Sequence, residues 1–410
     1  MNVSRFIANK IAFNQQRSFS RFVIRLSIAA TVISVAVMIL TMAFASGFKQ
    51  SISNKVFSFW GHIRIQNFEA QKVAIAEETP INRNDSVLKL KAQYPEIKTI
   101  QAYATKNAIL KTRETIEGVL FKGVEKDYDF GNLKNFLIEG RWLKFPDSGY
   151  SNEINLSQSI ARELKLKLND QLLVYFIQPG GAAPRPRKLT LTGIYKTGIE
   201  DYDKLIALCD LSLIQRLNDW TTSQIGGYEI FLHDYKKMDQ INDKVFYHIP
   251  IMFKSSTIEE VYPNIFDWLS LQDKTIYMVL VIMVAIAVLN LITCLLILVL
   301  ERTRMVGVLK AIGAGNLTIQ KIFLYHGAII TVTGIAFGNL LGFLVGWLQQ
   351  KFGFITLPEE AYYISKAEIN IVWWQVLAVN IGTFIVCFLV LLIPTVIIKR
   401  IQPVKAIQFR

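Results

Sequence analysis

The chain has 410 residues, of which 52% are hydrophobic, a mean hydropathy of +0.32 and a formal net charge of +13. This composition is typical of a membrane protein and excludes a disordered chain, while the 19% of charged residues must lie outside the bilayer. Only three cysteines occur, and two fall in apolar runs, which excludes a disulfide within the external part of one chain.

Four apolar runs reach the length that a helix needs to cross a bilayer. They cover residues 22–48, 275–300, 322–348 and 371–398. Each corresponds to about 39 Å or more of helix, which is enough to cross a ~30 Å hydrocarbon core with some tilt. The first run is too long for a cleaved signal peptide and is not followed by an A-x-A pattern, so we expect it to remain as an anchor.

Positive charge is concentrated beside these runs. Residues 1–25, 301–321 and 399–410 together carry 13 Lys and Arg but a single acidic residue. Residues 48–273, in contrast, hold 29 Lys or Arg and 28 Asp or Glu. Because Lys and Arg next to membrane spans are held on the cytoplasmic side, both termini are predicted to be cytoplasmic and the long segment external. The basic charge therefore indicates topology, and no nucleic-acid partner is expected.

Residues 1–21, before the first span, have the pattern of an amphipathic helix. Val3, Phe6 and Ile7 share one side of such a helix, while Lys10 lies elsewhere. We predict that this segment lies on the cytoplasmic membrane surface.

Small and hydroxyl-bearing residues form a stripe along the first span. They recur at alternating spacings of four and three, which places them on one face of a helix. Such a stripe is better buried against protein or a cavity than exposed to lipid tails. Two interpretations stay open, namely ordinary helix packing, or the lining of a lateral cavity or a contact with a second copy. The stripe consists of Ser27, Thr31, Ser34, Met38, Thr41 and Ala45.

The external segment, residues 49–273, alternates between strand and helix patterns. We predict an α/β domain interrupted by a β-rich insertion over about 130–220, with a helix from residue 258 leading into the second span. Asp85 is the expected N-cap of the first of its helices. Expected strands cover 61–66, 97–110, 115–123, 171–178, 188–195 and 228–232, with a short one near 251, and expected helices cover 86–93, 157–164 and 235–247.

A Pro- and Gly-rich stretch, PGGAAPRPR at residues 179–187, separates two of these strands. Two glycines and three prolines in nine residues are incompatible with a regular strand ladder, and the arginines favour solvent. We predict a semi-rigid projecting loop, which is either a binding arm or a hairpin tip without function. Its residues include Pro179, Gly180, Gly181, Pro184, Arg185, Pro186 and Arg187, followed by Lys188.

Residues 301–321 connect the second and third spans. Apolar residues recur here at helical spacing, and two glycines supply a stop. The segment is too short to span a membrane and too apolar for a free loop, so we predict a short helix at the membrane surface. Either it offers an apolar face to a cytoplasmic partner, or it only anchors the loop. The apolar positions are Met305, Val306, Val308, Leu309 and Ile312, and the glycines are Gly313 and Gly315.

Polar and small residues also mark the later spans. Asn290 is the main polar group within the second span, and we expect it to bond to another helix. In the third span, glycines at 334, 338, 342 and 346 predict the close approach of a neighbouring helix. The loop at 349–370 is expected outside, and residues 399–410 form a cytoplasmic tail.

Several chemical motifs are absent from the sequence. It contains no G-x-x-x-x-G-K-[ST], so the chain is not expected to bind ATP in the P-loop manner. The four histidines are dispersed, with no H-E-x-x-H and no paired cysteines, so we expect neither a metal site nor catalytic residues. Ionisable residues are missing from the centres of the spans, whereas a proton-coupled transporter usually needs at least one.

The chain resembles the MacB/FtsX-type ABC permeases, and most closely the LolC/LolE permeases of lipoprotein-releasing systems. The resemblance lies in the order of one span, a large external domain and three more spans, and in several short motifs. Residues 161–170 are also similar to the family pattern A-x-x-L-x-L-x-x-G-D, with Asn169 in place of its glycine. The motifs are SGF at 46–48, GHIRI at 61–65, LN at 289–290 with LERTR at 300–304, GVLKAIGA at 307–314, AYYI at 361–364 and PVKAI at 403–407.

The resemblance implies a fold of four transmembrane helices with a large α/β periplasmic domain, the MacB-like periplasmic core, between the first two. It also implies a bacterial inner-membrane permease that extracts lipoproteins with energy from ATP and passes them to a periplasmic carrier. Its partners would be a LolD-like ATPase that binds ATP and Mg, a second permease copy or paralogue, a LolA-like carrier, lipoprotein cargo and membrane lipid. No cofactor is expected on this chain.

The resemblance further implies roles for three sets of residues. The loop at 179–188 would capture the carrier, which favours a LolC-like or combined subunit over a LolE-like one. Residues of the first two spans would line a lipid cavity, namely Ser27, Thr31, Ser34, Met38, Thr41 and Asn290. The ATPase would dock on Arg302, Arg304, Met305, Val308, Leu309, Lys310, Ile312 and Gly313.

Two other functions remain open at this point. An efflux or mechanotransmission permease of the same family would share the cytoplasmic loop but lack a cavity for acyl chains. A membrane sensor with a periplasmic ligand-binding domain would not need a helix that couples to an ATPase.

Overall fold

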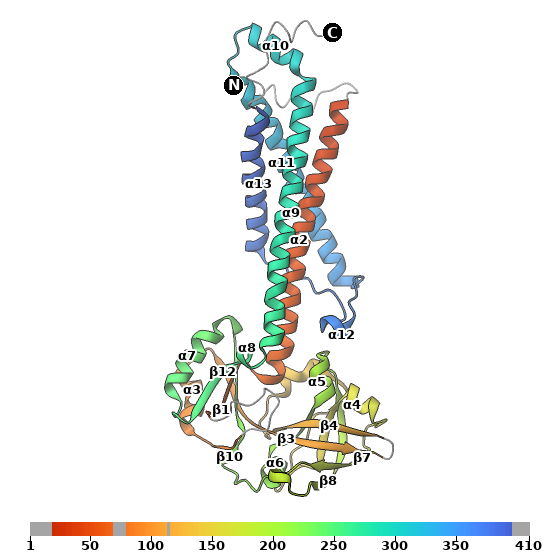
Figure 1. Cartoon of the computed structure of the whole chain (residues 1–410), viewed down its shortest axis with the longest axis vertical. Coiled ribbons are helices and arrows are strands. Elements are labelled where there is room, and N and C mark those ends of the chain that lie inside the picture. The colour runs from red at the N-terminus through yellow and green to blue at the C-terminus, as the bar shows by residue number, and fades with distance from the viewer. Residues whose placement is uncertain (1–18, 69–78, 113–114, 396–410) are drawn as a thin grey trace. The chain divides into compact units, whose positions relative to one another are not determined.

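A computed structural model describes residues 19–68, 79–112 and 115–395. The predicted tail at 399–410 and nearly all of the predicted surface helix at 1–21 lie outside these residues. The chain forms two compact units, a helical bundle and an external domain (Figure 1). Residues 51–268 and 357–365 make up the external domain, and the described residues before, between and after these ranges make up the bundle.

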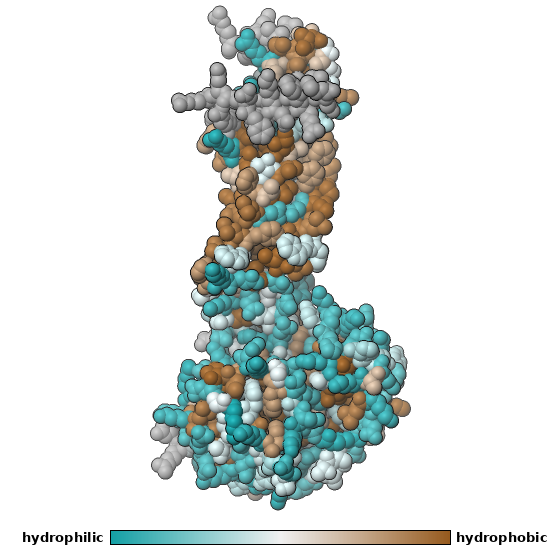
Figure 2. Space-filling view, turned by 180° about the vertical axis from the view of Figure 1, so that it is seen from behind, coloured by the Kyte–Doolittle hydropathy of each residue, from teal (hydrophilic) through white to brown (hydrophobic). Residues whose placement is uncertain are grey.

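The bundle contains four described helices that are long and apolar enough to cross a membrane. Apolar side chains, brown in Figure 2, gather over its surface, whereas hydrophilic ones, teal, cover most of the external domain. Three of the helices continue beyond the predicted spans, because polar residues at their ends keep helical backbone geometry. The four are α2 (Phe19–Trp60), α9 (Pro263–Glu301), α11 (Asn316–Phe352) and α13 (Trp373–Thr395), with the short α10 (Thr303–Ala311) between α9 and α11.

The glycine repeat of α11 packs against α2. A Cβ added at Gly338 would lie 2.7 Å from the Cβ of Val35, and one added at Gly334 would lie 2.6 Å from Cγ2 of Thr31. Backbones approach this closely only where no side chain separates them. The predicted close approach is therefore confirmed at these two positions.

The external domain is built on a ten-stranded mixed sheet in the order β12-β1-β11-β3-β4-β9-β6-β8-β5, with β7 paired to both β3 and β8. A separate two-stranded sheet joins β2 to β10. The strands are β1 (Ile63–Asn67), β2 (Ile81–Asn82), β3 (Ile97–Lys111), β4 (Ile116–Val124), β5 (Leu137–Gly140), β6 (Glu153–Ser157), β7 (Gln171–Phe176), β8 (Arg185–Tyr195), β9 (Ile206–Asp210), β10 (Gln224–Ile225), β11 (Gly227–Leu232) and β12 (Phe253–Thr257).

Part of this sheet closes on itself. β3 pairs with β4, β4 with β9, β9 with β6, β6 with β8, β8 with β7, and β7 pairs back with β3. Closure removes exposed edges and surrounds an apolar interior that includes Val174, Phe176 and Leu191. The strands predicted as a β-rich insertion thus share one sheet with β3 and β4.

Several helices of this domain begin at side-chain caps. Asn84, and not the predicted Asp85, caps α3 (Asp85–Gln93), because its side chain accepts a hydrogen bond from the backbone N–H of Ser86. Ser157 caps α4 (Gln158–Glu163), and Thr257 forms a capping box at α8 (Ile258–Val261). The remaining helices are α5 (Glu200–Leu205), α6 (Leu211–Leu217), α7 (Met238–His248) and α12 (Glu359–Tyr362), with 3₁₀ turns η1 (Phe130–Phe136), η2 (Pro179–Gly181) and η3 (Tyr235–Lys237).

A buried ion pair lies where α2 ends inside the external domain. The ammonium of Lys122 on β4 lies 2.8 Å from the Glu229 carboxylate on β11, and both side chains are at most 1% exposed. Lys122 also donates to the carbonyl oxygen of Phe59, in the last turn of α2. The last carbonyls of a helix have no partner within it, so this cation satisfies one of them and interacts favourably with the helix dipole.

His62, just after α2, makes the domain sensitive to acid. Burial, with a smaller contribution from the charge of Lys98, lowers the pKa of His62 from its ordinary 6.5 to about 4. Its Nδ1 accepts a hydrogen bond from the backbone N–H of Leu232, and its ring stacks on Phe57. The folded domain therefore holds the neutral imidazole.

We expect acidification to destabilise the external domain through His62. In the unfolded chain the His62 imidazole binds a proton with its ordinary pKa of 6.5, whereas in the folded domain it does so only near pH 4. The free energy of unfolding therefore falls as the pH drops from 6.5 to 4, by about 3 kcal/mol in all. Hydrogen exchange of the β3 and β4 amides, measured in the full chain from pH 7 to pH 4, tests this. His62→Asn, which keeps an acceptor for Leu232, should show a shallower dependence, and an equal slope in both proteins would contradict the assignment.

Candidate functional site

The predicted helix between the second and third spans is present as α10. It begins at Thr303, directly after Arg302, and ends at Ala311. Gly313 then adopts a φ of +91°, a left-handed conformation that glycine takes without a steric penalty. The N–H of Ala314 bonds to the Leu309 carbonyl oxygen at 2.9 Å and closes this end of the helix.

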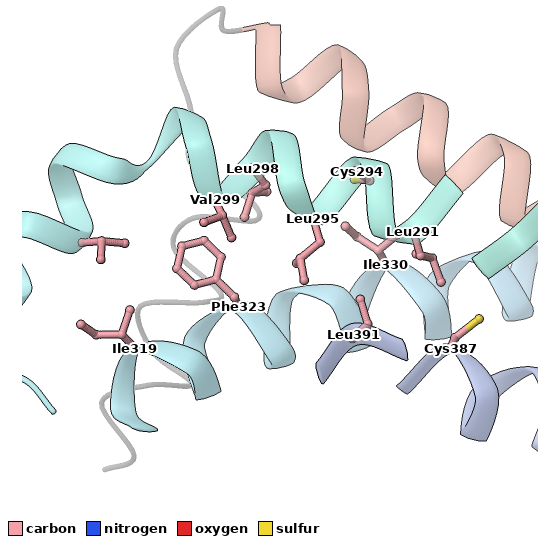
Figure 3. Close-up of a cluster of buried hydrophobic side chains, with 11 residues drawn as sticks. Leu291, Cys294, Leu295, Leu298, Val299, Ile319, Phe323, Ile330, Cys387 and Leu391 are labelled. Atoms are coloured by element: carbon pink, nitrogen blue, oxygen red, sulfur yellow. The ribbon is translucent and has the colours of Figure 1, made fainter. Parts of the chain in front are cut away.

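One side of α10 packs into the bundle. Val306 is fully buried in an apolar cluster, and Met305 and Leu309 pack against the same cluster while partly buried. Figure 3 shows the side chains of this cluster from α9, α11 and α13 directed toward one another. The sequence placed Met305 and Leu309 in the surface offered to a partner, but the structure places them against the bundle. The reason is that the apolar positions of α10 divide between two faces of the helix.

The other side of α10 is exposed. Val308 is 47% exposed, Ile312 is 75% exposed, and Leu317 at the start of α11 is 71% exposed. Arg304 lies one helical turn before Val308 and is also exposed. We call Arg304, Val308, Ala311, Ile312 and Leu317 the coupling face. Leu317, which the sequence prediction missed, is included because it is exposed and α11 starts only five residues after α10 ends.

The first four residues of the α2 stripe are buried within the chain, whereas Thr41 and Ala45 are partly buried. Ser27, Thr31, Ser34 and Met38 are at most 4% exposed. The Asn290 amide donates to the carbonyl oxygen of Ser27 at 3.1 Å, which joins α9 to α2. These four residues therefore follow the helix-packing interpretation, whereas Ala45 lines the hollow described next. The four buried residues and Asn290 take part in contacts within one chain, and the structure does not place them at an open lipid cavity.

A hollow of about 330 Å³ lies at another place between α2, α9 and α13. Apolar side chains from α2 and α9, among them Met42 and Ile276, form part of its wall. Lys49 on α2 forms an ion pair with Asp273 on α9 at 2.8 Å, and both side chains are about half exposed. Ser46 donates a hydrogen bond to Gln375 on α13. This mixed polar and apolar lining is chemically suited to an amphipathic molecule.

Another polar contact between membrane helices, between α11 and α13, was not predicted. The amides of Asn339 on α11 and Asn380 on α13 donate to each other, both at 3.0 Å. Two asparagines within apolar runs were a visible signal, but the sequence does not show that they face each other.

The Pro- and Gly-rich loop is shorter than predicted. β8 begins at Arg185, and its register pairs Pro186 with Tyr175 and Lys188 with Leu173. Up to Leu189, β8 pairs only with β7, because β6 joins it from Thr190 onward. Proline is tolerated in such an edge region, so the expectation that the prolines would interrupt the ladder was wrong for Pro186.

The arginines of this loop have partners within the domain. Both terminal nitrogens of Arg185 bond to Asp219, at 3.0 and 2.6 Å, and one also donates to the Leu217 carbonyl oxygen. The hydrogen bond and charge of Asp219 raise the pKa of Arg185. Arg187 donates to the carbonyl oxygen of Pro186. The projecting part of the loop is thus limited to residues 177–184, which include the η2 turn.

Two family models match the chain in sequence order. The MacB-like periplasmic core domain matches residues 26–245, and the FtsX-like permease C-terminal domain matches residues 277–403. The chain belongs to the MacB/FtsX-type permease family. Four membrane-spanning helices with a MacB-like periplasmic core fit a permease of the inner membrane.

The chain is similar over its full length to permeases of lipoprotein-releasing systems. The lipoprotein-releasing system transmembrane protein LolE of Haemophilus influenzae is 22% identical, with 100% of both chains covered. LolC of Xylella fastidiosa is 21% identical and LolC of Neisseria meningitidis serogroup B 20% identical, each with 96% of both chains covered.

Solved structures of external domains are also similar to part of this MacB/FtsX-type permease. The extracellular domain of the noncanonic ABC-type transporter YknZ from Gram-positive bacteria has a TM-score of 0.32 at 15% identity, covering 47% of this chain and 98% of that chain. The periplasmic region of MacB from Actinobacillus actinomycetemcomitans has a TM-score of 0.33 at 15% identity, covering 50% of this chain and 91% of that chain.

Proposed function

We propose that this chain is the permease subunit of an ATP-driven transporter that extracts lipoproteins from the inner membrane and passes them to a periplasmic carrier. The observation that carries the proposal is the similarity to LolE and LolC from end to end, which includes the bundle, the external domain and the cytoplasmic loop. An efflux permease and a membrane sensor are not favoured, because these relatives are named for lipoprotein release.

The energy source would be a separate ATPase. Acylated cargo is held in a bilayer by about 0.8 kcal/mol per buried CH₂ group, so spontaneous escape of several chains is very slow. A LolD-like subunit that binds ATP and Mg would dock on the coupling face, where exposed Arg304 is followed along the chain by exposed apolar Val308, Ile312 and Leu317. Exposed apolar residues with a polar rim mark sites of protein contact. Both termini would then be cytoplasmic, as the distribution of positive charge indicates.

Cargo and carrier would bind on the periplasmic side and in the membrane. The hollow that Lys49 and Asp273 flank offers apolar walls and polar groups together, as the glycerol region of an acylated lipoprotein requires. A LolA-like carrier would contact the projecting residues 177–184. A second permease copy or a paralogue would complete the transporter.

Co-purification tests the proposal. The full chain, solubilised in detergent from its own membranes, is isolated by affinity, and bound proteins are identified by mass spectrometry. We expect an ABC ATPase together with acylated lipoproteins or a LolA-like carrier. An ATPase without cargo or carrier would favour the efflux function instead, and the absence of any ATPase would refute the transporter assignment.

A further inference from the structure

A short segment between α11 and α13 belongs to the external domain. Residues 357–365 group with residues 51–268, whereas the chain on both sides of them, up to 356 and from 366, groups with the bundle. α2 and α9 enter the external domain as continuous helices, because α2 extends to Trp60 and α9 begins at Pro263. Between α11 and α13, the chain enters the external domain at residues 357–365.

Three contacts hold this segment in the external domain. Glu359 forms an ion pair with Lys196, which directly follows β8, and these side chains are 26% and 41% exposed. Lys55, near the end of α2, donates to the carbonyl oxygen of Tyr363 at 2.6 Å. The Tyr363 ring meets the ring of Trp268 edge to face, with centroids 5.8 Å apart. The segment therefore contacts α2, α9 and the sheet region at once.

The backbone of the segment is shaped for these contacts. The N–H of Leu357 bonds to the carbonyl oxygen of Ser365 and closes the loop at its base. Tyr363 has a φ of +59°, a conformation that is uncommon outside glycine and persists where surrounding contacts hold it. Gly198 has a φ of +75°, and a Cβ there would collide with the Glu359 carboxylate and the Lys55 ammonium. Gly198 thus provides the space in which both charged groups fit.

We propose that residues 357–365 form a clasp that fixes the chain between α11 and α13 to the external domain. A movement of the external domain must then act on all four membrane helices, and a movement of the bundle must act on the domain through the same contacts. The clasp does not depend on which cargo the transporter carries, so it goes beyond the proposed function.

Hydrogen–deuterium exchange of the full chain in detergent micelles, without nucleotide or cargo, tests the clasp. Lys196→Glu and Glu359→Lys each place like charges together, so we expect amides of 357–365 to exchange roughly fivefold faster, as loss of a partly exposed ion pair allows. Amides at 346–356 and 366–376, which cover the end of α11, the start of α13 and the loops next to them, should also exchange faster. The double variant restores an ion pair with the charges reversed and should return exchange to within about twofold of the wild type.

A matched control separates the clasp from general charge effects. Lys126→Glu makes the same charge change at an exposed ion pair with Asp147 and should leave all three stretches unchanged. The clasp would be overturned if the single variants exchanged as slowly as the wild type, or if the double variant exchanged as fast as the single variants. If only the amides of 357–365 exchanged faster, the clasp would not act on α11 and α13. If a charge reversal also speeds exchange of the β3 and β4 amides, the Lys55→Met variant tests the clasp instead. It removes the hydrogen bond to Tyr363 without reversing a charge. Because no cargo is present, the clasp and the proposed function can fail separately.

Discussion

Replacing Glu229 with glutamine is expected to lower the unfolding free energy of the external domain by about 3–5 kcal/mol. Lys122 would keep its positive charge in a site where its side chain is only 1% exposed, without the carboxylate 2.8 Å away. The Phe59 carbonyl oxygen and the ring of Trp60, whose centroid lies 4.6 Å from the ammonium, do not neutralise that charge. Hydrogen exchange of the β3 and β4 amides in the full chain would measure the loss.

Two comparisons show whether the loss comes from the unpaired buried charge. The double variant Lys122→Met with Glu229→Gln removes both charges and should recover most of the stability, because an apolar side chain of similar length fills the site. Lys126→Met removes one partner of the exposed pair with Asp147 and should leave exchange unchanged. A Glu229→Gln protein as stable as the wild type, or a double variant less stable than the single one, would show that the buried pair does not hold the end of α2.

Ile312→Asp is expected to weaken binding of the ATPase by roughly 30- to 100-fold. The side chain is 75% exposed in the coupling face, so the substitution adds a charge to the contact surface without entering the core of the bundle. Affinity of the purified chain for its ATPase subunit, measured in detergent, tests this. Thermal unfolding of the chain alone should remain unchanged.

Two further variants make this test specific. Ile251→Asp changes an isoleucine that is 97% exposed in the external domain and should leave ATPase binding as it is. Leu309→Asp, on the face of α10 that packs against the bundle, should lower the melting temperature of the chain. Wild-type affinity in Ile312→Asp would remove α10 from the ATPase contact and leave it as an anchor of the loop.

The existence of the main elements could be predicted from the sequence. Runs of apolar residues as long as 322–348 specify membrane helices almost regardless of context, because burying polar groups in hydrocarbon is costly. The glycine after α10 and the apolar spacing within it were likewise sufficient to predict a short helix between α9 and α11. These features depend on neighbours in the chain and on the solvent, and both are visible in the sequence.

Tertiary structure decided which surface each element uses. The sequence shows that Val306, Leu309 and Ile312 are apolar and recur at helical spacing. Only the position of α9 and α11 determines that the first two pack inward and that Ile312 remains exposed. The stripe of α2 was compatible with a cavity or a helix contact, and the structure shows that Asn290 bonds to Ser27 and that Gly334 of α11 lies against Thr31. Proline in β8 and the Lys122–Glu229 pair depend on partners more than ten residues away in the chain. Such contacts form only after the chain folds, so local sequence patterns identify the elements of this permease but do not assign their faces.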